Sequence, residues 1–357
     1  MYRLLIILLF VSVHVEAQQD STKSTFEWGA YAEAYYSHDF GKPANQQKVP
    51  FLYSYNRHQQ LSLNLVMGRV SYTSQRFRSV VALAAGTYMD DNLQAEDAVT
   101  GQVFEASVGF KLSKHKEWWL DMGILPSHIG FESAIGADQL TLTRSMMADN
   151  SPYYESGFRL SYNSSNQKWF LALLCVNGWQ RSIRADEPFQ PAFGHQLTYK
   201  HSNTLSINSS SFIGNDRHPT FRRMRYFHNL YGNWQLNKDC TVTAGFDIGW
   251  EQQTKGSSKI YNWYSPVLIL GYQITDHHRL AMRTEYYQDI HKVIVSSPAS
   301  VAFKTFGYSV NYDCKLSSSM LFRIEARSFS SVQPVFPTET GLKSNNFFMT
   351  SSISIRL

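Results

Sequence analysis

Residues that could catalyse hydrolysis are scattered along this chain rather than grouped. A serine hydrolase needs a hydroxyl nucleophile beside a histidine base. No Gly-Xaa-Ser-Xaa-Gly segment is present, and the nearest histidine groups are residues 276–278 and the pair His195 and His201. Arg283 and Glu285 stand two residues apart, which on a strand favours a salt bridge over acid–base catalysis. No group of His, Asp and Glu has the spacing of metal ligands. We therefore expect no enzyme activity, no cofactor and no metal.

Charged residues are instead spaced so that they would share one face of a strand. On the faces that we expect to point inward, nine carboxylates oppose nine basic residues: Glu27, Glu33, Glu105, Asp121, Glu155, Asp247, Glu251, Glu285 and Glu325 against Arg78, Lys111, Arg159, Lys200, Arg225, Arg283, Arg323, Arg327 and Arg356. A balanced wall predicts weak charge selectivity or local fields at a constriction. Pairing between neighbouring strands is the simpler interpretation for any one residue. The candidate lumen wall is Glu33, Glu105, Asp247, Arg283, Glu285, Arg323, Glu325 and Arg327.

The longest connection, residues 126–153, is the best candidate for a constriction. It carries Glu132 and Arg144 beside apolar residues that would be unusual on a fully solvated loop. If the loop folds into a lumen, we expect Glu132 and Arg144 at the constriction, with Glu155 and Arg159 on the following strand beside them. A loop that caps the outer mouth is the equally weighted alternative.

Strands must position these side chains, and the alternation of apolar with polar residues predicts them. At the carboxyl end, Phe347, Met349, Ile353, Ile355 and Leu357 alternate with polar residues. One apolar and one polar side suit a barrel with lipid outside and water inside. Sixteen segments show such a pattern: 26–37, 59–72, 77–89, 102–113, 117–125, 154–164, 168–178, 192–201, 204–215, 225–236, 240–251, 260–273, 278–288, 300–313, 320–330 and 346–357.

The connections between these segments alternate between long and short. Residues 38–58 and 126–153 are long, whereas residues 73–76 and 165–167 are short. This rhythm predicts an all-β fold, a single up-and-down antiparallel transmembrane β-barrel of about 16 strands, within a range of 14 to 18. An even strand number places both termini in the periplasm with the short turns. A barrel of this width encloses an aqueous lumen.

One segment breaks the expected alternation. Strict alternation from Leu61 would place Arg69 in lipid, at a cost of about 2 to 4 kcal/mol near the membrane midplane. We therefore expect either a bulge near Met67 or an interfacial position for Arg69.

Residues 1–17 have the features of a secretory signal peptide. Arg3 precedes an apolar run over residues 4–13, and small residues end the segment at Ala17. The barrel then occupies residues 18–357.

The composition of the chain suits a membrane barrel. Aromatic residues make up 15% of the chain and charged residues 17%, as expected for a barrel with aromatic girdles. The sequence has no block of basic residues, which argues against nucleic acid as a partner. Three cysteines, Cys175, Cys240 and Cys314, cannot all pair.

Several short motifs resemble one family. Residues 61–65 with Gly86-Thr87-Tyr88, residues 123–132, residues 151–160 and Asn177-Gly178-Trp179 are similar to segments of the OmpL-like β-barrel porins (porin-2 type) of Bacteroidota. The resemblance spans most of the chain, although the terminal Leu357 departs from the Phe more common at the end of such barrels. It implies an outer-membrane channel and supplies no catalytic residues.

These observations predict an outer-membrane porin, a passive diffusion channel for small hydrophilic solutes with weak charge selectivity. Its partners would be the lipid bilayer of the outer membrane and those solutes, with a monomer and a homo-oligomer both left open. The alternative is a barrel plugged by its own loops that acts as a lipase- or protease-type enzyme or as a surface-binding protein. His228, which falls on an outward face, is the one residue that favours it, although an interfacial histidine beside Tyr226 and Trp234 is the simpler interpretation.

Overall fold

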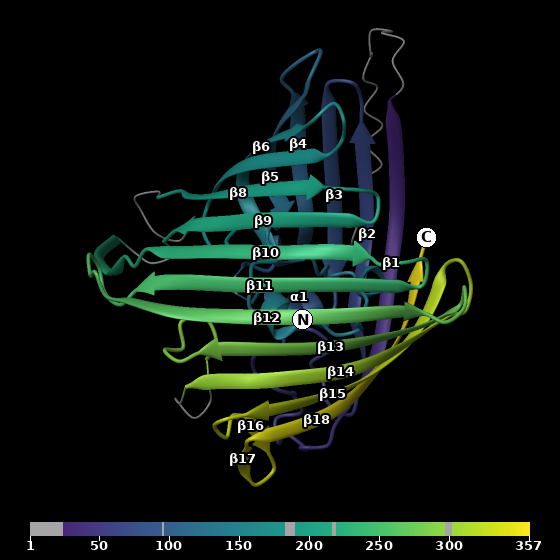
Figure 1. Cartoon of the computed structure of the whole chain (residues 1–357), viewed down its shortest axis with the longest axis vertical. Helices are drawn as coiled ribbons and strands as arrows, with labels where there is room; N and C mark the ends of the chain where they lie inside the picture. Colours follow the sequence, from purple (N-terminus) through teal and green to yellow (C-terminus); the bar gives the residue numbers. More distant parts are fainter. Residues whose placement is uncertain (1–23, 95, 183–189, 216–218, 297–301) are drawn as a thin grey trace, which may run out of the picture.

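Sixteen antiparallel strands among the described residues close into one barrel (Figure 1). The computed structural model describes residues 24–94, 96–182, 190–215, 219–296 and 302–357, so the predicted signal peptide lies outside the described residues. The barrel strands are β1 (Thr25–Asp39), β2 (Leu61–Thr73), β3 (Phe77–Ala85), β4 (Val103–Lys111), β5 (Glu117–Pro126), β6 (Tyr154–Asn163), β7 (Trp169–Val176), β8 (Ala192–Lys200), β9 (Leu205–Gly214), β10 (Arg225–Gln235), β11 (Cys240–Gln252), β12 (Ile260–Gln273), β13 (His278–Asp289), β14 (Phe303–Lys315), β15 (Met320–Ser331) and β18 (Asn345–Arg356). Each pairs with its neighbours in sequence, and β1 pairs with β18. The predicted up-and-down barrel of 16 strands is confirmed.

The remaining elements are short and lie in the long connections. They are the helices α1 (Thr87–Asn92) and α2 (Met146–Asp149), the 3₁₀ turns η1 (Thr100–Gln102), η2 (Gly136–Asp138) and η3 (Pro219–Phe221), and a hairpin of β16 (Phe336–Thr338) and β17 (Gly341–Lys343). The hairpin falls inside the connection predicted at 331–345, where three-residue strands leave no readable alternation. No helix in the described part of the chain is long and apolar enough to cross a membrane.

The strands direct apolar side chains outward and polar ones inward, as the alternation predicts. On β11, Phe246 is 40% exposed on the outer surface, whereas the next residue, Asp247, is 3% exposed inside the barrel. Trp28 on β1 and Leu173 on β7 are likewise outward and exposed. The outer surface therefore has the apolar character that lipid requires.

Arg69 points into the barrel because a bulge on β2 resets the alternation. Glu33 on β1 pairs with Leu65 and the next residue, Ala34, pairs with Leu63, so Asn64 is the extra residue. The bulge therefore lies three residues before the predicted position at Met67. It places Leu65 and Arg69 on the inward face and avoids the cost of a charge in lipid.

The two ends of the barrel differ. Short turns join the strands at the end where β1 begins and β18 ends, which runs from the top to the right of Figure 1, and longer connections lie at the other end. Two of these connections, residues 40–60 and residues 127–153, turn back into the barrel, where Val49, Phe51, Ile129 and Met146 are buried. The cysteines Cys175, Cys240 and Cys314 are all free.

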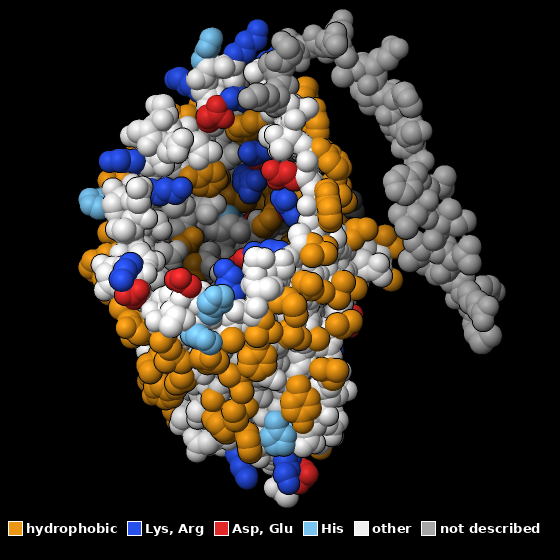
Figure 2. Space-filling model, turned by 90° about the vertical axis from the view of Figure 1, so that its right-hand side faces the viewer, with side chains coloured by type: hydrophobic (Ala, Val, Ile, Leu, Met, Phe, Trp, Pro, Cys, Tyr) orange, Lys and Arg blue, Asp and Glu red, His pale blue; other side chains and the backbone are white. Residues whose placement is uncertain are grey.

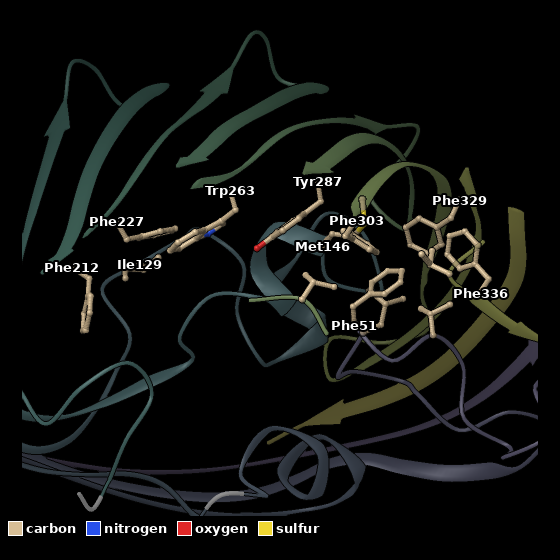
Figure 3. Close-up of a cluster of buried hydrophobic side chains, with 14 of the residues drawn as sticks. Phe51, Ile129, Met146, Phe212, Phe227, Trp263, Tyr287, Phe303, Phe329 and Phe336 are labelled. Atoms are coloured by element: carbon tan, nitrogen blue, oxygen red, sulfur yellow. The ribbon is translucent and has the colours of Figure 1, made fainter. Parts of the chain in front are cut away.

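An apolar core forms inside the barrel, between its wall and these two loops (Figure 3). The strands β9, β10, β12, β13, β14 and β15 each direct an aromatic ring inward: Phe212, Phe227, Trp263, Tyr287, Phe303 and Phe329. Phe51 of loop 40–60 packs on Phe303, with ring centroids 4.6 Å apart, and Ile129 and Met146 of loop 127–153 extend the cluster. These rings are at most 3% exposed and hold the loops in place by apolar burial.

Candidate functional site

The connection between β5 and β6, loop 127–153, docks on the opposite wall of the barrel. The backbone N–H of Thr143 donates to the Glu325 carboxylate at 2.6 Å, and the backbone N–H of Met146 donates to Glu285 at 2.6 Å. Glu325 and Glu285 belong to β15 and β13. Of the two positions that the sequence leaves open for this loop, the structure therefore places it within the lumen.

Three buried arginines on that wall hold the loop by its backbone. Arg283 donates to the carbonyl of Thr143 at 2.5 Å, and Arg327 donates to the carbonyl of Arg144 at 2.9 Å. Arg323 donates to loop carbonyls in the same way. A guanidinium carries five donors in a planar fork, so one side chain can bind both a wall carboxylate and a loop carbonyl.

The residues predicted to form the lumen wall point inward, but most face the docked loop rather than open lumen. Six are at most 2% exposed: Glu33, Arg283, Glu285, Arg323, Glu325 and Arg327. Asp247 is 3% exposed, and the side chain of Glu105 is 14% exposed. Buried charges need partners, and Arg283 with Glu325, at 2.8 Å, and Arg327 with Glu285, at 2.6 Å, supply them to one another.

Of the residues predicted at the constriction, Glu132 and Arg144 lie together on the lining of one cavity, and Glu155 and Arg159 do not. Glu132 accepts hydrogen bonds from the backbone and hydroxyl of Ser145, and burial raises the pKa of its carboxyl despite the nearby Arg283 guanidinium. Both Glu132 and Arg144 expose only a few per cent of their side chains.

Glu155 and Arg159 have other partners. Glu155 is fully enclosed, and its carboxylate lies 2.7 Å from Nδ1 of His128 at the start of the loop. Arg159 donates to Asp121 at 3.2 Å, nearer the short-turn end. Neither side chain is on the lining of the cavity that Glu132 and Arg144 share.

The cavity has a volume of about 420 Å³ and lies between loop 127–153 and strands β2 and β4. Met67 and Arg69 of β2 and Glu105 of β4 form one side, and residues 129–135 with Arg144 form the other. We call it the inner cavity. It is the space that the docked loop leaves open on the side of the barrel away from β13–β15.

A second cavity, of about 470 Å³, lies nearer the long-loop end and is called the outer cavity. Its lining includes Asp91, Asp149 and Trp179. Tyr153 lines both cavities. Its ring lies under the Arg144 guanidinium, 3.9 Å from the ring centroid, and its hydroxyl donates to the Asp149 backbone carbonyl at 3.0 Å. Tyr153 is thus the side chain that the two cavities share.

The short-turn end of the barrel is hollowed. Figure 2, which shows this end, has Lys and Arg side chains around the hollow with fewer Asp and Glu side chains. Arg78, Asp121 and Arg159 form an ion-paired group inside this end, with Arg78 donating to Asp121 at 2.6 Å. Solvent thus enters the barrel from the short-turn end.

Sequence reasoning did not assign Arg69 or Tyr153 to this site. The break in alternation before Arg69 indicates a bulge or an interfacial position, and it does not say that the Arg69 side chain reaches this cavity. Tyr153 belongs to the segment Ser151-Pro152-Tyr153-Tyr154, which resembles the porin family. Nothing in that segment indicates that the Tyr153 ring would lie between two cavities.

A polar cluster lies on the outer surface across β8, β9 and β10. Ser211 Oγ lies 2.6 Å from His195 Nδ1, His195 Nε2 lies 3.2 Å from Ser209 Oγ, and Ser209 Oγ lies 3.0 Å from His228 Nε2. His228, which sequence reasoning singled out, is therefore bonded to a serine on the lipid-facing side. Within the described residues, no group of three or more His, Cys, Asp or Glu side chains could hold a metal ion.

Comparison with solved structures shows the porin fold. An anion-selective porin from Comamonas acidovorans superposes with a TM-score of 0.64 at 8% identity, over 94% of this chain and 100% of that one. OmpT of Vibrio cholerae, in its trimer form, gives 0.63 at 8% identity over 94% and 99% of the two chains. OmpF of Salmonella typhi, in complex with daunomycin, gives 0.55 at 8% identity over 93% and 97%.

Sequence comparison identifies the family. No curated protein sequence matches this chain. Residues 25–357, which include every strand of the barrel, match the model of the family described as "Putative beta-barrel porin-2, OmpL-like". The chain belongs to this family of outer-membrane β-barrel porins.

Proposed function

We propose that this porin is a passive diffusion channel for small hydrophilic solutes, whose route runs from the outer cavity past Tyr153 into the inner cavity. The observation that carries the proposal is the pair of cavities that share Tyr153 beside a loop docked on the far wall. The hollow at the short-turn end continues the route on the other side of the barrel.

The charges along this route favour weak selectivity between anions and cations. Arg69 and Glu105 lie 3.8 Å apart on the barrel-wall side of the inner cavity, and Arg144 and Glu132 lie on its loop side. Together the linings of the inner and outer cavities carry four basic residues and five carboxylates, a near balance that gives no strong field of one sign. Solute size at Tyr153 should therefore matter more than solute charge.

The orientation follows from the architecture of related barrels in general. Bacterial outer-membrane barrels place short turns in the periplasm, and β1 begins and β18 ends at the short-turn end. We infer that both termini are periplasmic, that residues 1–17 are a signal peptide, and that the outer cavity opens to the outside. The trimeric form of the Vibrio cholerae protein supports a homo-oligomer here.

Replacing Tyr153 tests the route. In planar bilayers, the refolded barrel should give steady openings whose conductance rises with salt, and Tyr153→Ala should increase the single-channel conductance because it removes the shared side chain. Tyr153→Phe is the matched control, since it keeps the ring and loses the hydrogen bond to Asp149. Equal conductance in all three proteins would show that ions pass elsewhere, and a folded barrel that never conducts would refute the channel.

The Ser–His cluster on the outer surface raises the hydrolase alternative, but it lacks two parts. Ester hydrolysis by Ser209 with His228 as base needs donors for the oxyanion, and the backbone N–H groups of β8, β9 and β10 lie in strands that pair on both sides. Among the described residues, neither His195 nor His228 is bonded to a carboxylate that would orient it. A channel accounts for more of the structure.

A further inference from the structure

The wall of the inner cavity is largely apolar. Met67 and Phe104 on the barrel side face Ile129, Phe131 and Ile135 on the loop side. A cavity of about 420 Å³ with apolar walls and a few charges has the character of a small-molecule site. A passage that only admitted water and ions would not need this lining.

Two aromatic pairs stand on the lining of the inner cavity. Phe131 of the loop and Tyr231 of β10 have ring centroids 5.4 Å apart, tilted by 56°. Tyr88 and Tyr153 meet edge to face at 5.6 Å. These rings offer flat, rigid surfaces that an apolar group can contact with little loss of side-chain entropy.

One ion pair in the cavity is loosely held. Arg69 Nε lies 3.8 Å from Glu105 Oε2, and the side chains are 41% and 14% exposed. By contrast, the buried pair of Arg283 and Glu325 is 2.8 Å apart with both side chains fully buried. Among the described residues, the Arg69 side chain makes one hydrogen bond, a long one of 3.4 Å to the Ser71 hydroxyl. Arg69 and Glu105 are therefore free to rearrange around a ligand.

We propose that the inner cavity binds zwitterionic solutes with an apolar body, of the kind represented by apolar amino acids. The carboxylate of the solute would bind Arg69, its ammonium would bind Glu105, and its apolar body would contact Phe104 and Phe131. This inference rests on the proposed function, because the solute reaches the cavity along the route past Tyr153 or from the short-turn end.

The lining favours this class over sugars. A sugar that enters the cavity must give up water around several hydroxyls, and apolar walls offer few replacements, so unpaired hydroxyls oppose its binding. A zwitterion brings two charges, and the cavity supplies a partner of opposite sign for each. Its apolar body gains from leaving water.

Current block by L-phenylalanine tests the inference. In bilayers, L-phenylalanine should interrupt the potassium chloride current of the wild-type channel at about one tenth of the concentration needed for glycine or glucose, a preference of the size that one good interaction gives. Arg69→Gln should abolish this preference. Arg78→Gln, a matched change on β3 outside the cavity, should retain it, because Arg159 still pairs with Asp121 there.

The outcomes separate the inference from the proposed function. A channel that conducts but is blocked equally by L-phenylalanine, glycine and glucose overturns the inference and leaves the channel intact. If the folded barrel conducts no current, the channel proposal fails, and equilibrium dialysis of radiolabelled L-phenylalanine against detergent-solubilised protein then decides. Saturable binding lost in Arg69→Gln supports the site, and its absence overturns it.

Discussion

Arg283 is the residue whose loss should most disturb the docked loop. Its guanidinium donates to the Thr143 carbonyl and to Glu325, and it lies within 4 Å of carboxylate oxygens of Glu285 and Glu132. Arg283→Met keeps an unbranched apolar stem and removes the charge. Three carboxylates then remain at the interface between loop and wall without their shared partner.

The size of the effect follows from the burial of this network. Removing one partner of a buried ion pair costs about 3 to 5 kcal/mol, because the other charge stays buried and unpaired. If that cost falls on the docked state, the population of undocked loop rises roughly 100- to 4,000-fold, at 1.4 kcal/mol per tenfold. Arg144, which is 4% exposed when docked, then becomes accessible.

Limited proteolysis measures this population. When local opening is fast relative to cleavage, the rate of cleavage follows the open fraction. Trypsin should release the peptide that ends at Arg144 at least 100-fold faster from Arg283→Met than from wild type, a factor that follows from the lower cost above. The same variant should show brief excursions to higher conductance in bilayers.

Arg78→Met is the control for this experiment. Arg78 also points inward and pairs with a carboxylate, Asp121, but it makes no hydrogen bond to loop 127–153. If the two variants release the Arg144 peptide at rates within tenfold of each other, the buried arginines do not hold the loop.

Two further predictions concern groups whose titration affects stability. Both ring nitrogens of His128 face acceptors, the Glu155 carboxylate and the Ser211 carbonyl, each at 2.7 Å; burial opposes its charge, but Glu155 and these hydrogen bonds raise its pKa. The charged His128 therefore stabilises the fold below the unfolded pKa of about 6.5, and this stabilisation is lost as pH rises through the folded pKa. The unfolding temperature, measured by gel mobility, should fall between pH 6 and 9 more in wild type than in His128→Gln. An equal fall in unfolding temperature in the two proteins would contradict this. Burial, with the Arg327 charge adding to it, lowers the pKa of Lys48 to about 7, so the lysine destabilises the fold increasingly as pH falls from about 10 to 7. Lys48→Met should raise the unfolding temperature most at pH 6, and a variant no more stable than wild type would refute the burial argument.

The strands and their faces could be predicted because each depends on local alternation. Phe246 and Asp247 are neighbours in sequence and lie on opposite sides of the wall, as a period of two requires. The two departures are also local in origin. The break in alternation before Arg69 predicts a bulge near Met67, but the extra residue, Asn64, looks like any other polar residue, so the pattern does not give its position. The strands β16 and β17 are too short to show a period.

The role of the inward charges could not be predicted, because it depends on contacts between distant parts of the chain. Thr143 and Glu325 are 182 residues apart and share a 2.6 Å hydrogen bond. One feature of the sequence does indicate that the lumen is not filled by solvent alone. Arg327 and Phe329 occupy the same inward face of β15, and a fully solvated wall would not favour an exposed phenylalanine there.

The contacts that dock loop 127–153 explain why its sequence contains little that predicts docking. The wall already holds three buried ion pairs, Arg283 with Glu325, Arg327 with Glu285 and Arg323 with Asp313, and the loop adds Glu132, 3.9 Å from Arg283. It contributes backbone N–H and carbonyl groups, which every residue has, and these satisfy the donors and acceptors that the ion pairs leave over. The loop sequence must also leave space for this close approach of its backbone. At Gly136 an added Cβ would lie 2.3 Å from the hydroxyl of Tyr55 in loop 40–60 and 2.9 Å from the carboxylate of Glu33 on β1, so a residue without a side chain lets the loop backbone lie this close to both.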